Sequence, residues 1–148
     1  MKTIAEVLII PFIRNKKGTY LYATFLCKGD VYWAPVTGGV FENETFLQAA
    51  VREVWEETSV LPKQKDFIKL RAASMIPAPW LQLEGGNDLL IQEKCFALPM
   101  PTTDISLSEE HTQIKWLPFS RAFSLYRYDA HKIALWELNA SLIKTNLT

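Results

Sequence analysis

Three glutamates and an arginine stand close together near the middle of the chain, in the stretch Arg52-Glu53-Val54-Trp55-Glu56-Glu57. On a helix each residue advances about 100° around the axis. Counted from the arginine, the side chains of Glu56, Glu53 and Glu57 fall at roughly 40°, 100° and 140° and share one arc. Proteins hold Mg²⁺ with a few carboxylates together with substrate phosphates. The spacing therefore predicts a divalent cation site for a phosphate-containing ligand.

This acidic grouping costs helix stability, which argues that it has a function. Like charges at i,i+4, such as Glu53 and Glu57, destabilise a helix by about 0.2–0.5 kcal/mol, and anions near a helix C-terminus oppose the macrodipole. For such a pair taken alone, a solvated acidic face is the alternative. We expect the opposite face of the helix, at roughly 200–300°, to be buried. Its residues are Leu47, Val51, Val54 and Trp55.

The residues around the acids resemble the signature box of the Nudix hydrolases, G-x5-E-x7-R-E-U-x-E-E-x-G-U, in which U is aliphatic. The matching positions are Gly38, Glu44, Arg52, Glu53, Val54, Glu56, Glu57 and Val60. Ser59 stands where the family usually has glycine. A glycine there accepts the left-handed backbone of a helix C-cap. Serine can adopt it at a cost of about 1 kcal/mol, and a different helix end is the alternative. No metal ligand is lost by this change.

The resemblance implies an enzyme that uses Mg²⁺, with Mn²⁺ as an alternative, to hydrolyse a diphosphate linkage. It implies Glu53 and Glu57 as primary metal ligands, with Glu56 beside them. Glu56 or Glu57 would also serve as the general base. Arg52 would hold the acids in place. Glu44 would not bind the metal itself but would help to fix the loop that precedes the helix.

A second likeness indicates one particular branch of the family. The segment 108–117, together with 33–60, is similar to bacterial dATP (dihydroneopterin triphosphate) pyrophosphohydrolases. In those relatives a glutamate just before a histidine adds a metal ligand, which implies Glu110 here, both as a ligand and as a reserve base. A solvated turn is the alternative for Glu109 and Glu110. We interpret His111 as a structural neighbour of the site.

The resemblance implies a small-molecule substrate, a (deoxy)nucleoside triphosphate or a pterin triphosphate, split to a monophosphate and pyrophosphate. ADP-ribose, a dinucleoside polyphosphate and an oxidised nucleotide are alternatives within the enzymes. An alternative of another kind is a ligand-binding Nudix-like module without catalysis. Many relatives dimerise, so a homodimer is a further expectation.

Two further features suit substrate contacts. Gly38 and Gly39 lead into the box, and we expect them to form a loop whose φ freedom lets the backbone approach a ligand; a tight turn is the alternative. Trp80, in a proline-rich loop, and Trp33 can stack on a flat heterocycle. Simple loop packing is the alternative for Trp80, and Trp33 has the weaker claim because it precedes a predicted strand.

The composition limits the other functions. The chain of 148 residues suits one domain, 1–148, with 49% hydrophobic and 22% charged residues. Sixteen basic residues balance sixteen acidic ones, so no global field recruits nucleic acid or anionic lipid. No apolar run of roughly 18–20 residues is present, and residues 1–6 lack the apolar region of a secretory signal, so we expect neither a membrane span nor secretion. Cys27 and Cys95 are isolated, which favours free thiols and a reducing cytoplasm.

The remaining pattern predicts the elements that position the box. Apolar runs predict strands at 7–13, 20–26, 67–76, 89–98 and 114–117, and the turn at 15–18 makes the first two a hairpin. A helix is expected at 128–144, with a core face of Ile133, Leu135, Trp136, Leu138 and Leu142. Strands mixed with one internal and one terminal helix favour a layered α/β fold. The family resemblance implies a Nudix α/β/α sandwich with a mixed central β-sheet.

Overall fold

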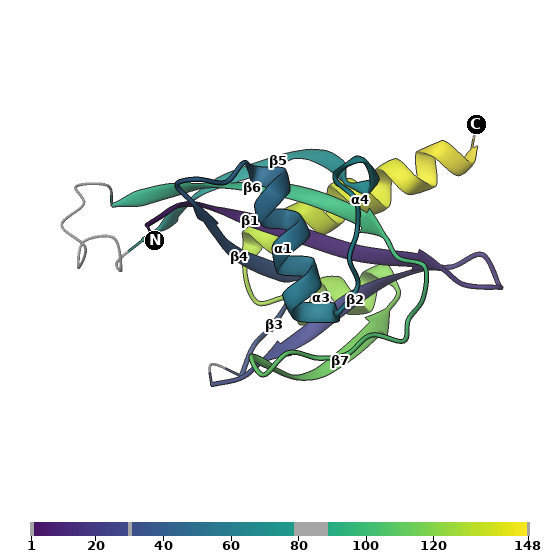
Figure 1. The fold of residues 1–148 in the computed structure, drawn as a ribbon. Coiled ribbons are helices and arrows are strands. Elements are labelled where there is room, and N and C mark those ends of the chain that lie inside the picture. The colour runs from purple at the N-terminus through teal and green to yellow at the C-terminus, as the bar shows by residue number, and fades with distance from the viewer. Residues whose placement is uncertain (1, 30, 79–88, 148) are drawn as a thin grey trace.

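The computed structural model describes residues 2–29, 31–78 and 89–147 (Figure 1). Its strands are β1 (Thr3–Arg14), β2 (Tyr20–Cys27), β3 (Trp33–Ala34), β4 (Val36–Phe41), β5 (Ile68–Pro77), β6 (Leu90–Pro99) and β7 (His111–Leu117). Its helices are α1 (Phe46–Thr58), the short 3-10 turn η1 (Gln64–Asp66), α3 (Phe119–Leu125) and α4 (Asp129–Leu147). All five predicted strands and both predicted helices are confirmed, with ends that differ by a few residues.

The sheet is mixed and is built around β1. This strand runs parallel to β6 and antiparallel to β2 and β4. Along one edge, β1 pairs first with β4 through residues 3–9 and then with β2 through residues 12–14. Strands β3 and β7 pair with β2, and β5 pairs with β6. The sheet therefore branches at β1, because β4 and β2 occupy the same edge at different heights.

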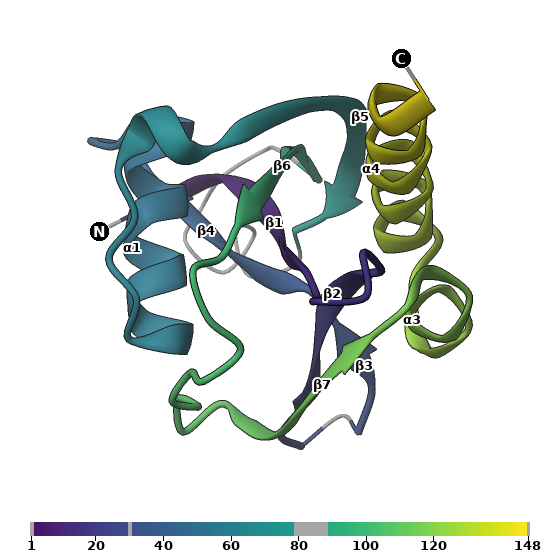
Figure 2. The same cartoon turned by 90° about the vertical axis from the view of Figure 1, so that its right-hand side faces the viewer.

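Helices cover both faces of this sheet. Helix α1 lies on one side, and α3 and α4 lie on the other (Figure 2). The alternation of side chains along β1 supplies both cores: Val7 and Ile9 pack in the cluster under α1, whereas Leu8 and Ile10 pack in the cluster with α3 and α4. All four side chains are fully buried. The expected α/β/α sandwich with a mixed sheet is confirmed.

The expectation that Gly38 and Gly39 form a loop with unusual φ angles is wrong. Both residues lie in β4, where they pair with Val7 and Glu6 of β1. Neither needs a left-handed backbone, since the positive-φ glycines among the described residues are Gly18 and Gly29. The segment is a strand because Val36 and Val40, on either side of the pair, are buried in the core under α1.

The expected core face of the C-terminal helix is wrong in part. Leu135 and Leu138 are fully buried, but Ile133 and Trp136 are 60% and 61% exposed. At about 100° per residue, Ile133 lies roughly 160° from Leu135 around the helix axis, so the two cannot face the same sheet. Leu142 is half-buried and packs against the core with α3 and α4.

Helix α3 was not predicted from the sequence. Pro118 supplies its N-cap position with an extended backbone, and Ala122 is fully buried. A proline after a strand indicates the strand's end, and it is equally compatible with a helix start, so the pattern alone did not separate the two.

Two simpler expectations concern the thiols and membranes. Cys27 and Cys95 are both free, and Cys95 is buried, as the isolated positions predicted. Among the described residues, no helix combines the length and apolar character that crossing a bilayer requires.

The C-cap of α1 yields a first prediction. Ser59 has a left-handed backbone, with φ 62° and ψ 14°, and its N–H donates to the carbonyl of Trp55 at 2.9 Å. Of the two alternatives for this position, serine thus adopts the left-handed cap. Its side chain is exposed, so Ser59→Gly removes the Cβ penalty and loses little packing. We expect the free energy of unfolding, measured by urea denaturation, to rise by about 1 kcal/mol. Ser59→Ala keeps the Cβ and is the control; an equal gain in both variants would contradict the explanation.

Candidate active site

Helix α1 begins and ends at defined caps, which fixes the height of its acidic residues. At its start Thr45 and Gln48 form a capping box: the Gln48 N–H donates to the Thr45 hydroxyl at 3.1 Å, and the Thr45 N–H donates to the Gln48 side chain at 2.9 Å. Ala49, Ala50 and Val54 are fully buried against the sheet. The small alanines let the helix approach the sheet closely.

The expected buried face of α1 is confirmed at Val54 and at Leu47, which packs on the core, but the buried face also includes two of the acids. Glu53 and Glu57 are only 8% and 2% exposed, whereas Trp55, expected on the buried face, is 50% exposed. The buried arc runs from Ala49 to Thr58, roughly 60–240° counted from Arg52, and it includes both carboxylates. Two acids thus lie between the helix and the sheet, where each charge requires a partner.

Arg52 is the partner that connects the helix to β4. Its Nε and Nη2 donate to the two carboxylate oxygens of Glu44 at 2.8 and 2.9 Å. Its Nη1 donates to Glu53 at 2.8 Å, and its Nη2 also donates to the carbonyl of Gly39 at 2.7 Å. The guanidinium lies 4.4 Å from the ring centre of Phe41. The hydrogen bonds with Arg52 hold the pKa of Glu44 below its usual range, so this carboxylate stays ionised.

Glu53 lies against the backbone of β4 at Gly38. A Cβ placed on Gly38 would overlap the Glu53 carboxylate, so only glycine leaves room for it. Burial raises the pKa of Glu53 to about 7, against the hydrogen bond and charge of Arg52, and the charges of Glu56 and Glu57 raise it further. The close approach that we expected between Gly38 and a ligand is instead made by a protein carboxylate.

Glu57 is held by two residues from the approach to β7. Ser108 Oγ donates to its carboxylate at 2.8 Å, and His111 Nδ1 forms an ion pair with the same oxygen. Burial alone would raise the pKa of Glu57, but these hydrogen bonds outweigh it and lower the pKa. Burial also opposes a charged His111, yet its contacts with Cys27 and Glu57 raise its pKa to about 9. The His111 ring also packs 5.2 Å from that of Phe25, between ring centres.

Glu56 and Glu110 complete the acidic group. Glu56, with a half-exposed side chain, has an oxygen 3.5 Å from Nη1 of Arg52. Glu110 lies close enough to Glu57 for the charge of Glu57 to be the main cause that raises its pKa. Glu53 and Glu110 therefore each interact electrostatically with Glu56 and Glu57, so the four acids form one connected group around one end of α1.

The chemistry of these donors suits a hard divalent cation, because every candidate ligand is a carboxylate oxygen. In this structure, however, Glu53 and Glu57 contact protein partners. In the described part of the chain, no three His, Cys, Asp or Glu side chains converge as a metal-binding group. A bound cation would therefore exchange with contacts made by Arg52, Ser108 and His111. It would also relieve the repulsion among the four acids.

A large cleft opens on the α4 side of the sheet, close to the acids. It has a volume of about 650 Å³, within the roughly 300–1,000 Å³ usual for small-molecule sites. Its lining residues are Glu6, Tyr32, Thr37, Ile76, Pro77, Glu93, Tyr128, Asp129, Ala130 and His131. Burial, with the charges of Glu93 and Glu53, raises the pKa of Glu6 to about 8. Glu6 thus links this cleft electrostatically to α1.

A smaller pocket of about 390 Å³ adjoins the cleft, since Tyr32 and Thr37 line both. Its other lining residues are Cys27, Lys28, Glu109, Glu110 and His111. Because Glu110 and His111 contact Glu57, the two pockets form a path from the acidic group to the cleft. The path follows the branch of the sheet, where β4 and β2 separate.

Two predicted substrate contacts remain without a test. Trp33 lies in β3, with the Lys115 ammonium 5.0 Å from its ring centre, and its role stays a prediction. Trp80 lies outside the described residues. Gly39 contributes its carbonyl to Arg52 rather than to a ligand.

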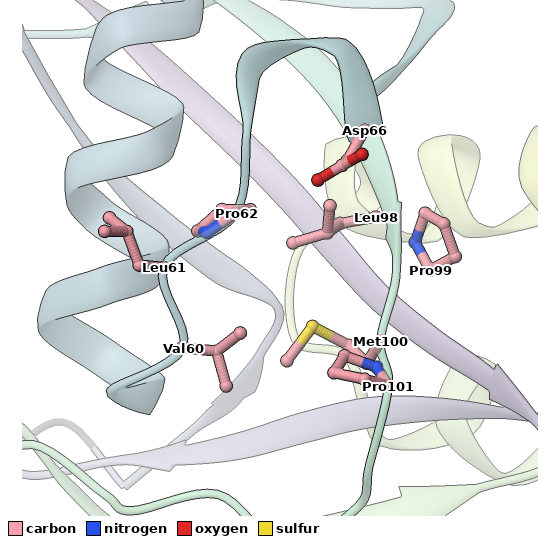
Figure 3. Close-up of a pocket in the computed structure, with 8 residues that line it drawn as sticks. All are labelled: Val60, Leu61, Pro62, Asp66, Leu98, Pro99, Met100 and Pro101. Atoms are coloured by element: carbon pink, nitrogen blue, oxygen red, sulfur yellow. The ribbon is translucent and has the colours of Figure 1, made fainter.

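A third pocket, of about 380 Å³, lies beyond the end of α1 (Figure 3). Val60, Leu61 and Pro62 form one side of it, and residues 98–101 at the end of β6 form the other. Its lining is apolar apart from Asp66 and contains none of the predicted site residues. We therefore place the candidate active site at the acidic group and the cleft.

Ser108, Glu93 and Glu6 were not predicted as site residues, whereas His111 was predicted as a neighbour of the site and contacts Glu57. Ser108 gave a weak signal, as a polar residue three positions before His111 beside a predicted strand. Glu93 and Glu6 gave a stronger one, since each is a carboxylate within an apolar strand, at a position whose i+2 neighbour is buried. Nothing in the sequence pairs them, because their contact depends on the parallel register of β1 and β6, which aligns Glu6 with Glu93.

Comparison with known proteins gives matches over most of the chain. Residues 4–136 match the NUDIX domain family model. In sequence, the chain is 30% identical to phosphatase NudJ of Escherichia coli K12 over 56 residues, which span 38% of this chain and only 37% of NudJ. In structure, it is similar to a Nudix hydrolase of Listeria monocytogenes, with a TM-score of 0.82, 27% identity and 95% of each chain covered. The dihydroneopterin triphosphate pyrophosphohydrolase of E. coli gives a TM-score of 0.75 at 24% identity, over 91% of this chain and 95% of that enzyme.

The contact of Gly38 with Glu53 predicts an effect on cation binding. Gly38→Ala places a methyl group where the Glu53 carboxylate lies, so Glu53 has to move away from Arg52. We expect Mn²⁺ affinity, measured by isothermal titration calorimetry, to fall at least about tenfold. Gly39→Ala is the matched control, since its Cβ meets only the side chain of Thr3, at 3.0 Å. Circular dichroism checks that both variants fold. Equal Mn²⁺ affinity in folded Gly38→Ala and wild-type protein would contradict the role given to this contact.

His131 predicts a pH dependence of stability. Burial lowers its pKa to about 4 from the usual 6.5, so the folded state holds it neutral while the unfolded chain protonates it. Its contribution to stability is complete above pH 6.5 and is lost as the pH falls toward 4, by at most about 1.4 kcal/mol per pH unit. Urea denaturation of wild type and His131→Gln at several pH values measures the difference. A difference that does not change between pH 7 and 4 would show that His131 titrates normally.

Proposed function

Because the chain belongs to the NUDIX domain family, we propose that it is a Mg²⁺-dependent pyrophosphohydrolase of a nucleoside or pterin triphosphate. Water attacks phosphorus, and the products are a monophosphate and pyrophosphate. Family membership and the NudJ match support a hydrolase that acts on phosphorus-containing anhydrides. The pterin alternative draws support from the likeness in fold to the dihydroneopterin triphosphate pyrophosphohydrolase.

One observation carries the proposal: four glutamates repel one another at the end of a path into a cleft large enough for a nucleotide. A protein gains nothing in stability from buried like charges. A divalent cation with the phosphates of a substrate would compensate these charges. In this arrangement Glu53 and Glu57 would hold the cation, joined by Glu56 and Glu110.

When bound, Mg²⁺ would neutralise phosphate charge and lower the pKa of a coordinated water. The side chains of the protein then have separate tasks. Arg52 fixes the orientation of Glu53 through Glu44 and the carbonyl of Gly39. Ser108 and His111 fix Glu57.

The general base accepts the proton of the attacking water. Glu56 and Glu57 are the candidates on α1, with Glu110 as a third. The contacts favour Glu56, because its side chain is half exposed and lies 3.5 Å from the guanidinium of Arg52. Glu57 already accepts hydrogen bonds from two protein partners and is buried.

A binding module without catalysis is the second candidate. The contacts of Glu53 with Arg52, and of Glu57 with Ser108 and His111, favour it, since they satisfy these carboxylates without a metal. The full acidic set argues against it, because a module that only binds a ligand does not need four carboxylates in repulsion.

A substrate panel separates the two candidates. We expect nucleoside triphosphates to be converted to nucleoside monophosphate and pyrophosphate, separated by ion-exchange chromatography, only when Mg²⁺ is present. EDTA should abolish the conversion. ADP-ribose and a dinucleoside polyphosphate belong in the same panel as alternative substrates. Binding of a nucleotide in EDTA with no turnover in Mg²⁺ would favour the module and overturn the proposed function.

The role of Glu57 gives a sharper prediction. Glu57→Gln removes the negative charge but keeps the shape and an oxygen that accepts from Ser108. We expect kcat to fall by about 100-fold or more while the melting temperature stays near that of the wild type. Glu42→Gln, an exposed glutamate before the helix, is the matched control and should keep full activity. Near-normal turnover in Glu57→Gln would contradict the assignment of this ligand.

A further inference from the structure

Two residues that line the large cleft each have a buried polar atom without a hydrogen-bond partner in the described part of the chain. These atoms are Oε1 of Glu93 and Nδ1 of His131. Glu93 is 2% exposed and His131 is 7% exposed. A buried polar atom without a partner costs about 1–3 kcal/mol. Both residues that bear this cost line one cavity, where a small shift of either side chain would let a ligand supply the missing partner.

Two carboxyl groups, those of Glu93 and Glu6, belong to the same wall of the cleft. Glu6 lies beside Glu93 in the register of β1 and β6. Ser74, its partner across β5 and β6, makes a hydrogen bond with the Glu93 carboxyl, which leaves Oε1 for a ligand. Burial raises the pKa of Glu93 to about 7, so a ligand that donates N–H groups would stabilise its ionised form.

Aromatic side chains provide flat surfaces in the same cleft. The rings of Tyr32 and Tyr128 meet edge to face with centres 5.3 Å apart, and those of Tyr128 and His131 do so at 5.4 Å. Ile76 and Pro77 add apolar surface. Aromatic and apolar walls around a few buried polar atoms are the usual surroundings of a flat heterocyclic ligand.

We infer that this cleft binds the heterocycle of the substrate, and that Glu93 selects a ring whose edge carries adjacent N–H donors. The 2-amino-4-oxopyrimidine ring, shared by guanine and pterin, has such an edge, with a ring N–H next to an exocyclic amino group. This inference rests on the proposed function, because it assigns the base subsite of the same hydrolase.

Other common bases fit this wall less well. Adenine and cytosine present a ring nitrogen acceptor next to their amino group, and that acceptor would face the Glu93 carboxylate without a proton between them. A site built to bind an N–H group rejects an analogue that lacks it, because its own buried acceptor stays unpaired. Hypoxanthine keeps the ring N–H but lacks the amino group, so its binding should be intermediate.

The cleft is also placed correctly for a ligand whose phosphates reach the acids. Thr37 lines the cleft, and the next residue, Gly38, contacts the Glu53 carboxylate from β4. Glu6 lines the cleft and is close enough to Glu53 for its charge to raise the pKa of Glu6. A base beside Glu93 can therefore carry its phosphates toward α1 within one molecule.

The test compares kcat/KM for GTP, ITP and ATP with Mg²⁺ in wild type and Glu93→Met. For the wild type we expect the order GTP, ITP, ATP, with GTP at least about 30-fold above ATP. Glu93→Met should bring this ratio close to one. Because the variant removes a buried carboxyl with an unpaired oxygen, its melting temperature should also rise. Gln92→Met, exposed at the adjacent position on the opposite face, is the matched control and should change neither value.

The outcomes separate this inference from the proposed function. Equal kcat/KM for all three nucleotides in the wild type would overturn the inference and leave the hydrolase intact. A uniform loss of activity in Glu93→Met with a lower melting temperature would show a purely structural role for Glu93 and also overturn it. A higher kcat/KM for neopterin triphosphate than for GTP would identify pterin as the source of the ring.

If no triphosphate is hydrolysed, the proposed function fails and the cleft is tested by binding alone. Isothermal titration calorimetry with guanosine, neopterin and adenosine in EDTA is then the measurement. Preference for the first two over adenosine, lost in Glu93→Met, would support the subsite. Equal affinity for all three, or no binding by the wild type, would overturn it.

Discussion

The guanidinium of Arg52 is the contact on which the rest of the site depends. It binds Glu44 through two hydrogen bonds, Glu53 through a third and the β4 carbonyl of Gly39 through a fourth. One rigid, permanently charged group thereby ties α1 to the sheet and supplies positive charge to an acid that burial would otherwise neutralise. Lysine, as a single point charge, could not make this set of contacts.

This network explains why the sheet and the helix have their observed form. Glu53 can lie against β4 only because Gly38 has no side chain, so the glycine is needed for space and not for a turn. Glu57, one turn later, is held from the opposite side by Ser108 and His111. The acids thus stand beside the branch of the sheet, where two adjoining pockets lead to the α4 side. The acids and the two pockets therefore lie near the point where β1 changes its pairing partner from β4 to β2.

Local patterns predicted much of this structure. The strands and the two long helices followed from periodicity and from a motif within one segment, and the layered α/β class followed from their order. The α/β/α sandwich followed from the family resemblance. The burial of Glu53 and Glu57 did not follow, because helical angles give relative directions but do not say which arc faces the sheet. The cleft was also beyond prediction: Glu93 and His131 are brought together by strand register and by the packing of α4, which no local pattern contains. Ile133 and Trp136 show the same limit, since an apolar residue in a helix is not necessarily on its core face.

Everything proposed for this site requires Glu53 and Glu57 to bind one divalent cation together. The decisive experiment is a crystal structure of the protein with Mn²⁺ and a non-hydrolysable nucleotide, with anomalous diffraction data. We expect an anomalous peak bound by both carboxylates and by phosphate oxygens, with Glu57 turned away from His111. A bound nucleotide with Glu53 still on Arg52, Glu57 still on His111 and the Mn²⁺ peak elsewhere would show that the two acids do not form a metal site.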